Sequence, residues 1–467
     1  MNYKERQHAE NRRWKLLPKW RHLTIFEELL HNEFLARDTQ KRYADKLLVY
    51  MLRHSNRTVP FYQHLFAQHG IDVKKIRGIE DLHQLPILNR GAVQENSKKL
   101  KATQLPSKIR IGGTTKTSGS TGQPVEVLHS HNSLHYFSVL KQREYRTWGF
   151  DPSRRLVTIR PASEGPHKNG ERLEVEQSAS RACWPVVGEF FYTGDSPFLP
   201  DMSSTDFITK WLNEQKPAYL LCMSAVLERI ALGFANTENV TGLLAALAIS
   251  QQLTRGMREL AEKTVAPEVQ QNYGLNEIGV VAMRCPESGQ YHVHNECCLV
   301  EVVDEQGRPC APGVAGKLLV TSLQNYAMPL LRYDTDDLAE MVTEPCPCGR
   351  SAQSFVNIKG RYRRTAHLPA GTWEYWDAIL YVFGHASKQE MAPVKQYQLH
   401  QRSANKFDLK IKVDSAVPES LINKIHERCR MAGKGKSIDL TIYELDRIEQ
   451  PGKKFQNFIS DISPPEE

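Results

Sequence analysis

The sequence predicts an α/β protein with a large multi-sheet body and a small α+β domain behind it. Strand-like and helix-like runs alternate between about residues 105 and 360, and a β-β-α-β pattern follows residue 362. The chain of 467 residues, 40% of them hydrophobic, is long enough for a large core and more than one domain. We expect a large domain over residues 1–361 and a small mobile domain over 362–467.

Each element follows from its local pattern. Segments such as KRYADKLLVYMLRHS mix apolar and charged residues, which predicts that residues 1–100 are mainly helical. RLVTIRP and AYLLCM are strand-like, whereas TDFITKWLNEQ and SAVLERIALGF are helix-like. In the last segment Leu227, Ile230 and Phe234 share one helical face. The alternation favours an α/β body.

Hairpins are expected later in the chain. LVEVVDEQGRPCAPG and the following GKLLVTSL predict two strands around a turn. KQYQLHQ, FDLKIKVD, a helix around LINKIHERC and SIDLTIYEL supply the β-β-α-β pattern of the small domain.

Composition excludes several classes. The longest apolar run, over residues 242–249, is too short for a membrane span, and the N-terminus lacks the apolar core of a signal peptide. We therefore expect no membrane association and a cytoplasmic protein. A net charge of +8 without an aromatic-interleaved basic stripe argues against nucleic acid as a partner. Nine scattered cysteines predict reduced thiols, as candidate ligands of a metal, rather than a disulfide framework.

One loop has the chemistry of a phosphate site. The stretch TTKTSGSTGQPVEV, residues 114–127, combines hydroxyl groups with glycines that let backbone N–H groups approach a ligand closely. It is not the common NTPase P-loop, because no Gly-Lys-Ser/Thr ends it. The alternative is a flexible surface linker. The candidate donors are Thr117, Ser118, Gly119, Ser120, Thr121 and Gly122.

TSGSTGQP resembles the phosphate loop of the adenylate-forming acyl and aryl acid ligases. TVPFYQHLFAQHGID and LPILNR are similar to the N-terminal region of the phenylacetate–coenzyme A ligase branch, and the resemblance runs from about residue 45 to the end. It implies a large adenylate-forming domain with a small C-terminal lid, and ATP held by residues 117–122. Relatives in this branch are often dimers, so a homodimer is one expected state.

QNYGLNEIG resembles the family's tyrosine-glycine-x-x-glutamate motif. The resemblance places Tyr273 against the adenine, Gly274 and Asn276 beside the nucleotide, and Glu277 on the Mg²⁺ that accompanies ATP. A carboxylate suits Mg²⁺, and a flat aromatic ring suits a purine. The alternative is a buried tyrosine beside a surface glutamate.

Two further motifs complete the implied nucleotide site. LLRYDTDDLAE resembles the motif whose last aspartate accepts both ribose hydroxyls, here Asp337, although Asp336 replaces the usual glycine of a tight turn. IKGRYRR resembles the sequence that closes the large domain, with Arg361 on the ribose or phosphate. The acidic hinge positions that follow in the family are Arg363 and Arg364 here, which puts a second half-reaction with coenzyme A in question.

PGKKFQNFIS resembles the family's glycine-lysine motif, whose lysine bridges the substrate carboxylate and the α-phosphate. An ammonium group there stabilises the charge that develops as the carboxylate attacks phosphorus and pyrophosphate leaves. The register of the following residues favours Lys454, and the register of the glycine favours Lys453. The resemblance thus implies Lys454 or Lys453, with Glu277, as the catalytic residues.

Cysteines and histidines offer a metal site. Cys346 and Cys348 lie in CPCGR, and CPESGQYHVH contributes Cys285 and two histidines, a set that suits a structural zinc. The set is similar to cysteine and histidine positions in some members of the branch, and His292 fits that pattern better than His294. Cys297 and Cys298 are alternative ligands, and buried free cysteines are the alternative to a metal.

The resemblance implies an enzyme that activates a small carboxylic acid, aromatic or otherwise apolar, to an acyl-AMP with ATP and Mg²⁺. The acyl group then passes to coenzyme A or another thiol. Direct amide formation with an amine is a second hypothesis, and a non-catalytic nucleotide-binding homologue is a third, suggested by Asp336, Arg364 and Gln251. Tyr136, in a helix-like segment after the phosphate loop, is the candidate for substrate contact.

Overall fold

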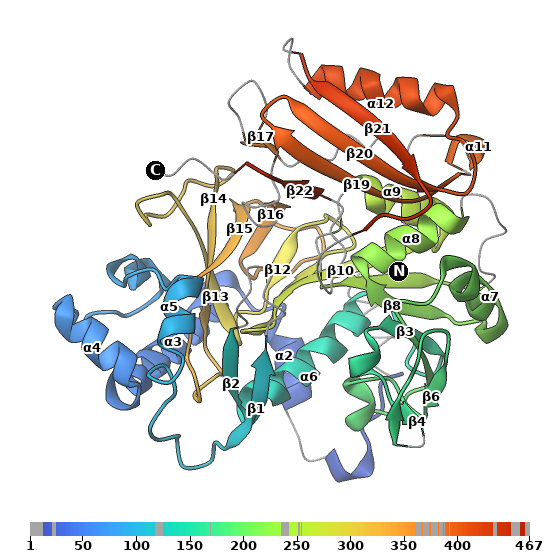
Figure 1. Cartoon of the computed structure of the whole chain (residues 1–467). Coiled ribbons are helices and arrows are strands. Elements are labelled where there is room, and N and C mark those ends of the chain that lie inside the picture. Colours follow the sequence, from blue (N-terminus) through green and yellow to red (C-terminus); the bar gives the residue numbers. More distant parts are fainter. Residues whose placement is uncertain are drawn as a thin grey trace. The chain divides into compact units, whose positions relative to one another are not determined.

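The chain divides into two compact units, which we describe separately (Figure 1). The first comprises Met1–Asp151, Val186–Tyr192 and Asn272–Lys359, and the second comprises Pro152–Pro185, Thr193–Gln271 and Gly360–Glu467. The computed structural model describes residues 13–20, 25–116, 125–168, 170–234, 242–250, 253, 255–359, 366–367, 373–374, 382, 386, 388–391, 393–432, 437–449 and 458–462.

The first unit begins with helices, as predicted for residues 1–100. After the short η1 (Pro18–Trp20) and α2 (Ile25–Asn32), the long helix α3 (Arg37–Thr58) ends at the extended Val59, and α4 (Pro60–Gln68) starts with proline at its first position. Proline disfavours helical backbone in the residue before it but fits the first turn, so the two helices separate at this point. A 3₁₀ helix, η2 (Ile79–Gln84), and α5 (Arg90–Glu95) follow.

The glycine-rich loop connects two paired strands. Strand β1 (Ile111–Lys116) runs antiparallel to β2 (Glu126–Ser130), with Lys116 opposite Glu126. Helix α6 (His131–Thr147) starts directly after β2, and the Ser130 side chain accepts a hydrogen bond of 3.3 Å from the Ser133 amide. The strand predicted after the loop is therefore confirmed, and the two strands on either side of the loop pair antiparallel.

Antiparallel pairs make up the sheet of the first unit, in the order β13-β14-β15-β16-β12-β11-β10. The predicted hairpin is β13 and β14, paired from Cys298↔Ser322 to Val303↔Lys317. The strand bounds are β10 (Glu268–Leu275), β11 (Gly279–Arg284), β12 (Tyr291–Val293), β13 (Cys298–Val303), β14 (Ala315–Ser322), β15 (Tyr333–Val342) and β16 (Ser354–Lys359).

The second unit contains the parallel part of the α/β body, in the order β10-β9-β8-β3-β7, with β6 antiparallel to β7. The predicted strands are β3 (Leu156–Arg160) and β8 (Tyr219–Met223), and the predicted helices are α7 (Thr205–Gln215) and α8 (Ser224–Phe234). Leu227, Ile230 and Phe234 are all buried, as the helical face requires. The other bounds are β6 (Ala179–Arg181), β7 (Ser196–Pro200), β9 (Ala245–Ile249) and α9 (Arg255–Thr264), with η3 (Ala162–Glu164), β4 (His167–Lys168) and β5 (Glu171–Arg172) on connecting segments. The short helix η4 (Val187–Glu189) belongs to the first unit.

The C-terminal β-β-α-β prediction is also confirmed. Strands β19 (Val394–Ser403) and β20 (Lys406–Val413) form a hairpin, α12 (Glu419–Ala432) follows, and β21 (Asp439–Leu445) pairs parallel to β20. β22 (Phe458–Ser460) adds a fourth strand parallel to β19. The remaining short elements are β17 (Ala366–His367), β18 (Trp373–Glu374) and α11 (Lys388–Met391). The expected domain boundary at 361 lies outside the described residues.

The structure bears on two expectations from composition, the state of the cysteines and the presence of membrane-spanning helices. All nine cysteines lie in described residues, and none forms a disulfide. Among the described residues, no helix has the length and apolar character needed to cross a bilayer.

Candidate nucleotide and metal sites

Two predicted nucleotide-binding residues meet in the first unit. Tyr273 on β10 and Asp337 on β15 are joined by a hydrogen bond of 2.6 Å, which the tyrosine hydroxyl donates to Oδ2 of the carboxylate. Tyr273 is buried, and burial together with the Asp337 charge raises the pKa of its hydroxyl well above the ordinary value. The phenol therefore stays a neutral donor. Its ring also contacts Phe355 edge-on, with centroids 5.7 Å apart.

Asp336 adopts the backbone conformation that the usual glycine would supply. Its φ is +61°, in the left-handed region that aspartate tolerates better than most residues. Its amide donates to Oδ1 of Asp334 at 2.9 Å, and the β14–β15 register shifts between Lys317 and Leu319. Such an irregularity re-aims the side chains that follow it, in this case Asp337. The left-handed backbone that glycine would allow is therefore present at Asp336, as an irregularity within β15 and not as a tight turn.

Glu277 is held by two residues that motif reasoning did not single out. Nη1 of Arg90 donates to its Oε1 at 3.0 Å, and the hydroxyl of Tyr333 donates to the same oxygen at 3.2 Å. The carboxylate is only 5% exposed, so the alternative of a surface glutamate is wrong. Arg90 lies inside LPILNRG, and Tyr333 lies beside Asp334 in the aspartate motif. Both segments stand out in the sequence, but nothing in them indicates a contact with Glu277.

Arg332, in the same motif, has a structural role. It is buried, forms an ion pair of 3.1 Å with Glu301, and donates to the carbonyl oxygens of Leu85 and Gly307 at 2.6 and 2.8 Å. These bonds tie the segment before α5 to the strands that carry Asp337. The arginine of this motif therefore helps to place the segment on which Arg90 lies.

Gly274 and Asn276 lie on the exposed side of the turn between β10 and β11. A Cβ atom at Gly274 would lie 3.0 Å from the Gly279 carbonyl oxygen, and the strand register shifts at this point. The close backbone approach explains the glycine. Both residues are accessible to a ligand.

Several predicted residues lie outside the described residues. These are Thr117, Ser118, Gly119, Ser120, Thr121 and Gly122 in the loop, together with Arg361, Lys453 and Lys454.

Tyr136 lies on α6 and is half-buried, with its hydroxyl bonded to that of Tyr43 on α3. Burial raises the pKa of Tyr136, so the phenol is neutral. A cavity of about 20 Å³ beside α6 is lined by Phe137, Leu140 and Cys297 among others, which is room for about one water molecule.

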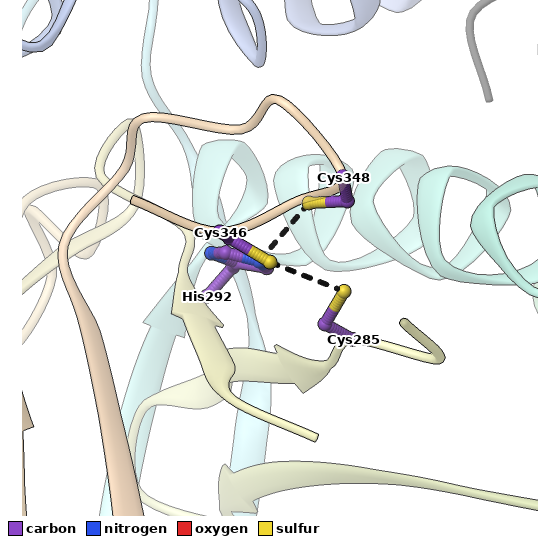
Figure 2. A group of neighbouring side chains, drawn as sticks. All are labelled: Cys285, His292, Cys346 and Cys348. Atoms are coloured by element: carbon purple, nitrogen blue, oxygen red, sulfur yellow. Dashed lines mark hydrogen bonds between the residues drawn. The ribbon is translucent and has the colours of Figure 1, made fainter. Parts of the chain in front are cut away.

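The four predicted metal ligands converge (Figure 2). Cys285 follows β11, His292 lies on β12, and Cys346 and Cys348 lie in the segment between β15 and β16. All four are buried, and their ligand atoms lie within 4.8 Å of one another. Residues 61 positions apart in sequence, Cys285 and Cys346, approach to 3.6 Å between their sulfurs.

The spacing fits zinc. A tetrahedral ion with Zn–S bonds of about 2.3 Å and Zn–N bonds of about 2.0 Å separates two sulfurs by about 3.8 Å and a sulfur from a nitrogen by about 3.5 Å. The Cys285–Cys346 distance is 3.6 Å, and Nε2 of His292 lies 3.4 Å from Sγ of Cys348. Hydrogen bonds from Cys346 and Cys348 lower the pKa of Cys285, which favours the thiolate that binds metal.

The alternative ligands lie elsewhere. β12 ends at Val293, and the ring of His294 turns away, with Nδ1 2.5 Å from Nη2 of Arg143. The thiol of Cys298 instead contacts backbone carbonyl oxygens, and burial raises the pKa values of both Cys297 and Cys298. The four ligands that lie close together are therefore the three cysteines and His292, not His294.

A buried charged network adjoins this site in sequence through Arg350. Arg143 on α6 pairs with Glu33 and Glu296 at 3.0 Å each, and Arg350, two residues after Cys348, pairs with Glu33 at 3.0 Å. On the next residue of α6, the Glu144 carboxylate accepts from Lys141 and from the Asn272 amide at 3.0 Å each. All carry complementary charges or hydrogen bonds, which is how buried charge is tolerated. The network contacts β10 immediately before Tyr273.

The α/β body, the small C-terminal sheet and the Tyr273–Asp337 pair place the chain in the adenylate-forming class of folds. A 2-hydroxyisobutyryl-CoA ligase in the postadenylation state matches it with a TM-score of 0.72 and 15% identity, over 92% of this chain and 91% of that chain. An anthranilate CoA ligase in complex with anthranoyl-AMP matches with a TM-score of 0.52 and 15% identity, over 79% of this chain and 72% of that one.

Within that class, the chain is similar in sequence to phenylacetate–coenzyme A ligases, the branch that the motifs indicated. The phenylacetate–coenzyme A ligase of Thermus thermophilus is 26% identical over 342 residues, which cover 70% of this chain and 72% of the relative. That of Escherichia coli is 26% identical over 344 residues, 71% of each chain. No family model matches the chain.

Proposed function

We propose that this protein is an ATP-dependent, AMP-forming acid ligase. It activates a carboxylic acid, aromatic or otherwise apolar, as an acyl-adenylate and passes the acyl group to coenzyme A or another thiol. Homology to phenylacetate–coenzyme A ligases supports the class of reaction. The observation that carries the proposal is that Asp337, from one motif, contacts Tyr273, from a second motif that also contains Glu277, in one unit of the fold.

Different residues of the chain are proposed to bind different parts of the nucleotide. The Asp337 carboxylate offers two acceptor oxygens to vicinal ribose hydroxyls, and the Tyr273 hydroxyl fixes its orientation. The Tyr273 ring supplies the flat surface for adenine, beside the accessible Gly274 and Asn276. From the family resemblance, Arg361 binds the ribose or phosphate.

Glu277 is the proposed ligand of the ATP-bound Mg²⁺. Its carboxylate is fixed by Arg90 and Tyr333 through Oε1, and a fixed carboxylate oxygen suits a hard cation. The ion, when bound, neutralises charge on the phosphates. The backbone and hydroxyl groups of residues 117–122, on a loop between two paired strands, would hold the phosphates themselves.

In the first step, a carboxylate oxygen of the acid forms a bond to the α-phosphorus, and the bond to the bridging oxygen breaks as pyrophosphate leaves. The substrate carboxylate and the α-phosphate carry like charges, so an ammonium between them lowers the barrier. Lys454 or Lys453 is proposed for that position. Tyr136 is proposed to contact the acid, and residues 362–467 are proposed as the mobile lid.

We also propose a structural zinc at Cys285, His292, Cys346 and Cys348, on the distances given above. The ion would join the segment after β11, strand β12 and the β15–β16 connection. No step of the reaction is assigned to it. A cytoplasmic location and a homodimer remain predictions from the sequence.

The acyl acceptor distinguishes two versions of the proposal. Coenzyme A is the default of the relatives' class, but Arg363 and Arg364 replace the acidic hinge residues that the resemblance leads one to expect. This substitution favours, as the second candidate, direct amide formation with an amine. A non-catalytic homologue is the third version, and the left-handed backbone at Asp336 weakens one of its arguments.

Exchange of labelled pyrophosphate into ATP tests adenylation, because it requires formation and reversal of the acyl-adenylate. A panel of aromatic, aryl-alkanoic and aliphatic acids should include at least one that promotes exchange. Absence of exchange with every acid, from folded protein that binds ATP, would support the non-catalytic alternative. Product masses with coenzyme A or with amines then identify the acceptor.

Single variants Lys453→Ala and Lys454→Ala identify the bridging lysine. One of them should lose exchange by at least about a hundredfold, while the other, its matched control, stays near wild type. If both retain exchange, neither lysine bridges the two substrates.

A further inference from the structure

An apolar cavity of about 140 Å³ lies in the helical part of the first unit. Its buried walls include Tyr62 and Phe66 of α4, Leu85 and Leu88 of the segment before α5, and Leu331 before β15. These residues come from three stretches of the chain, and none of the five side chains is itself assigned to the nucleotide or to the zinc, although Leu331 lies within LLRYDTDDLAE. The cavity is therefore separate from both proposed sites.

The side chains that line the cavity offer no free hydrogen-bonding group to a ligand. The Tyr62 hydroxyl already donates to the Pro329 carbonyl at 3.1 Å and accepts from the Leu331 amide at 3.0 Å. The other lining side chains carry no polar atom. Apolar cavities of about 150 Å³ in proteins stay dry and bind benzene. Size and chemistry together select an uncharged compound of about one aromatic ring.

One side of the cavity lies nearer to solvent than the rest. Phe61, Leu65, Pro86 and Ile87 line it but are only half-buried, in contrast to the buried walls. Two of these residues lie on α4 and two on the segment before α5. Small side-chain movements at this rim would admit a ligand without unfolding either helix.

One wall belongs to the segment that carries Arg90. Leu88 and Ala92 line the cavity on either side of that arginine, which bonds to Glu277 at 3.0 Å. The Leu88 amide donates to the Arg332 carbonyl at 3.0 Å, and the Asn89 side chain caps α5 by accepting from the Ala92 amide at 2.8 Å. A ligand in the cavity would pack against this segment and hold it in place.

We propose that this cavity is a binding site for a neutral, single-ring aromatic molecule, and that its occupancy steadies the segment from Leu85 to Ala92. The site goes beyond the proposed reaction and does not depend on it. Burial of a ring against these side chains supplies the affinity, because apolar surface of both the ligand and the protein is removed from water.

Fluorobenzene is a suitable probe, followed by ¹⁹F NMR on the full chain. Ala92→Leu fills the cavity from α5, and Leu65→Phe fills it from α4. Ala67→Leu is the matched control, because it adds the same bulk at an exposed position of α4. We expect saturable binding to wild type and Ala67→Leu, and at least tenfold weaker binding to both filled variants.

Hydrogen exchange locates the bound probe independently of activity. Fluorobenzene should slow exchange in peptides that cover residues 85–93, and the effect should vanish in Leu65→Phe. Absence of saturable binding to wild type, or unchanged binding by both filled variants, overturns the proposal. So does protection confined to other segments, which would place the ring elsewhere, such as the acid site. If Ala92→Leu does not fold, Leu65→Phe alone decides.

Discussion

The hydroxyl of Tyr273 lies 2.6 Å from Oδ2 of Asp337, although 64 residues separate the two in sequence. One residue comes from the tyrosine motif on β10, and the other follows the left-handed Asp336 on β15. The contact brings two separate sequence motifs together in space. The proposal that Asp337 binds the ribose can therefore be tested by substitution.

Asp337→Asn should raise the KM for ATP by about 10- to 100-fold, because a hydrogen bond to a charged group contributes about 1.5–3 kcal/mol. It should also reduce discrimination between ATP and 2′-deoxy-ATP, measured by pyrophosphate exchange. Asp336→Asn is the matched control, since asparagine tolerates the same φ of +61°. Equal KM values in the two variants would remove Asp337 from the nucleotide site.

Glu277→Gln should raise the Mg²⁺ concentration for half-maximal exchange by at least about tenfold, because an amide oxygen is a much weaker ligand for Mg²⁺ than a carboxylate. Tyr333→Phe removes only the hydroxyl that orients Oε1, so a smaller change is expected. Glu287→Gln, at an exposed position, serves as control. An unchanged Mg²⁺ requirement in Glu277→Gln would contradict the assignment.

Purified protein should contain about one zinc per chain. Cys346→Ser should lose the metal and lower the melting temperature, whereas Cys298→Ala should keep it, because Cys298 lies outside the quartet. A strong chelator should lower the melting temperature of wild type but not of Cys346→Ser. Metal-free protein with the wild-type melting temperature would reject the site. Mass spectrometry under native conditions measures the metal directly.

Arg143→Met should destabilise the fold by about 3–5 kcal/mol, because it leaves Glu33 and Glu296 buried without their shared partner. Arg308→Met removes an exposed pair with Asp304 and should cost less than about 1 kcal/mol. Urea unfolding of both variants measures the difference. Similar values for the two would mean that the network contributes no more than a surface ion pair.

The stability of the protein should fall as the pH drops below about 6.5. Burial lowers the pKa values of His54 and His129, so below the ordinary value the unfolded chain takes up protons that the folded chain does not. Proton uptake by the unfolded state favours unfolding. His129→Gln should reduce the loss of stability between pH 7.5 and 5.5, whereas exposed His64→Gln should not. A steeper loss of stability with falling pH in His129→Gln would contradict the expected contribution of His129.

The sequence by itself determined the elements and the class. Periodicity gave α7, α8, β8 and the C-terminal β-β-α-β unit, because amphipathic spacing depends on neighbours along the chain. Motif order identified Tyr273, Glu277 and Asp337, and ligand chemistry identified the metal quartet, since these signals rest on residue type and spacing.

Only the tertiary structure decided which distant residues act together. Arg90 and Tyr333 meet at Glu277 from separate segments, and nothing in LPILNRG indicates that contact. Helix α6 has an ordinary polar composition, yet Arg143 and Glu144 are buried. Arg143 is paired by Glu33, just after α2, and by Glu296 in the β12–β13 segment, and Arg350 in the β15–β16 segment pairs with the same Glu33. Such pairing is a property of three-dimensional packing, which local spacing does not encode.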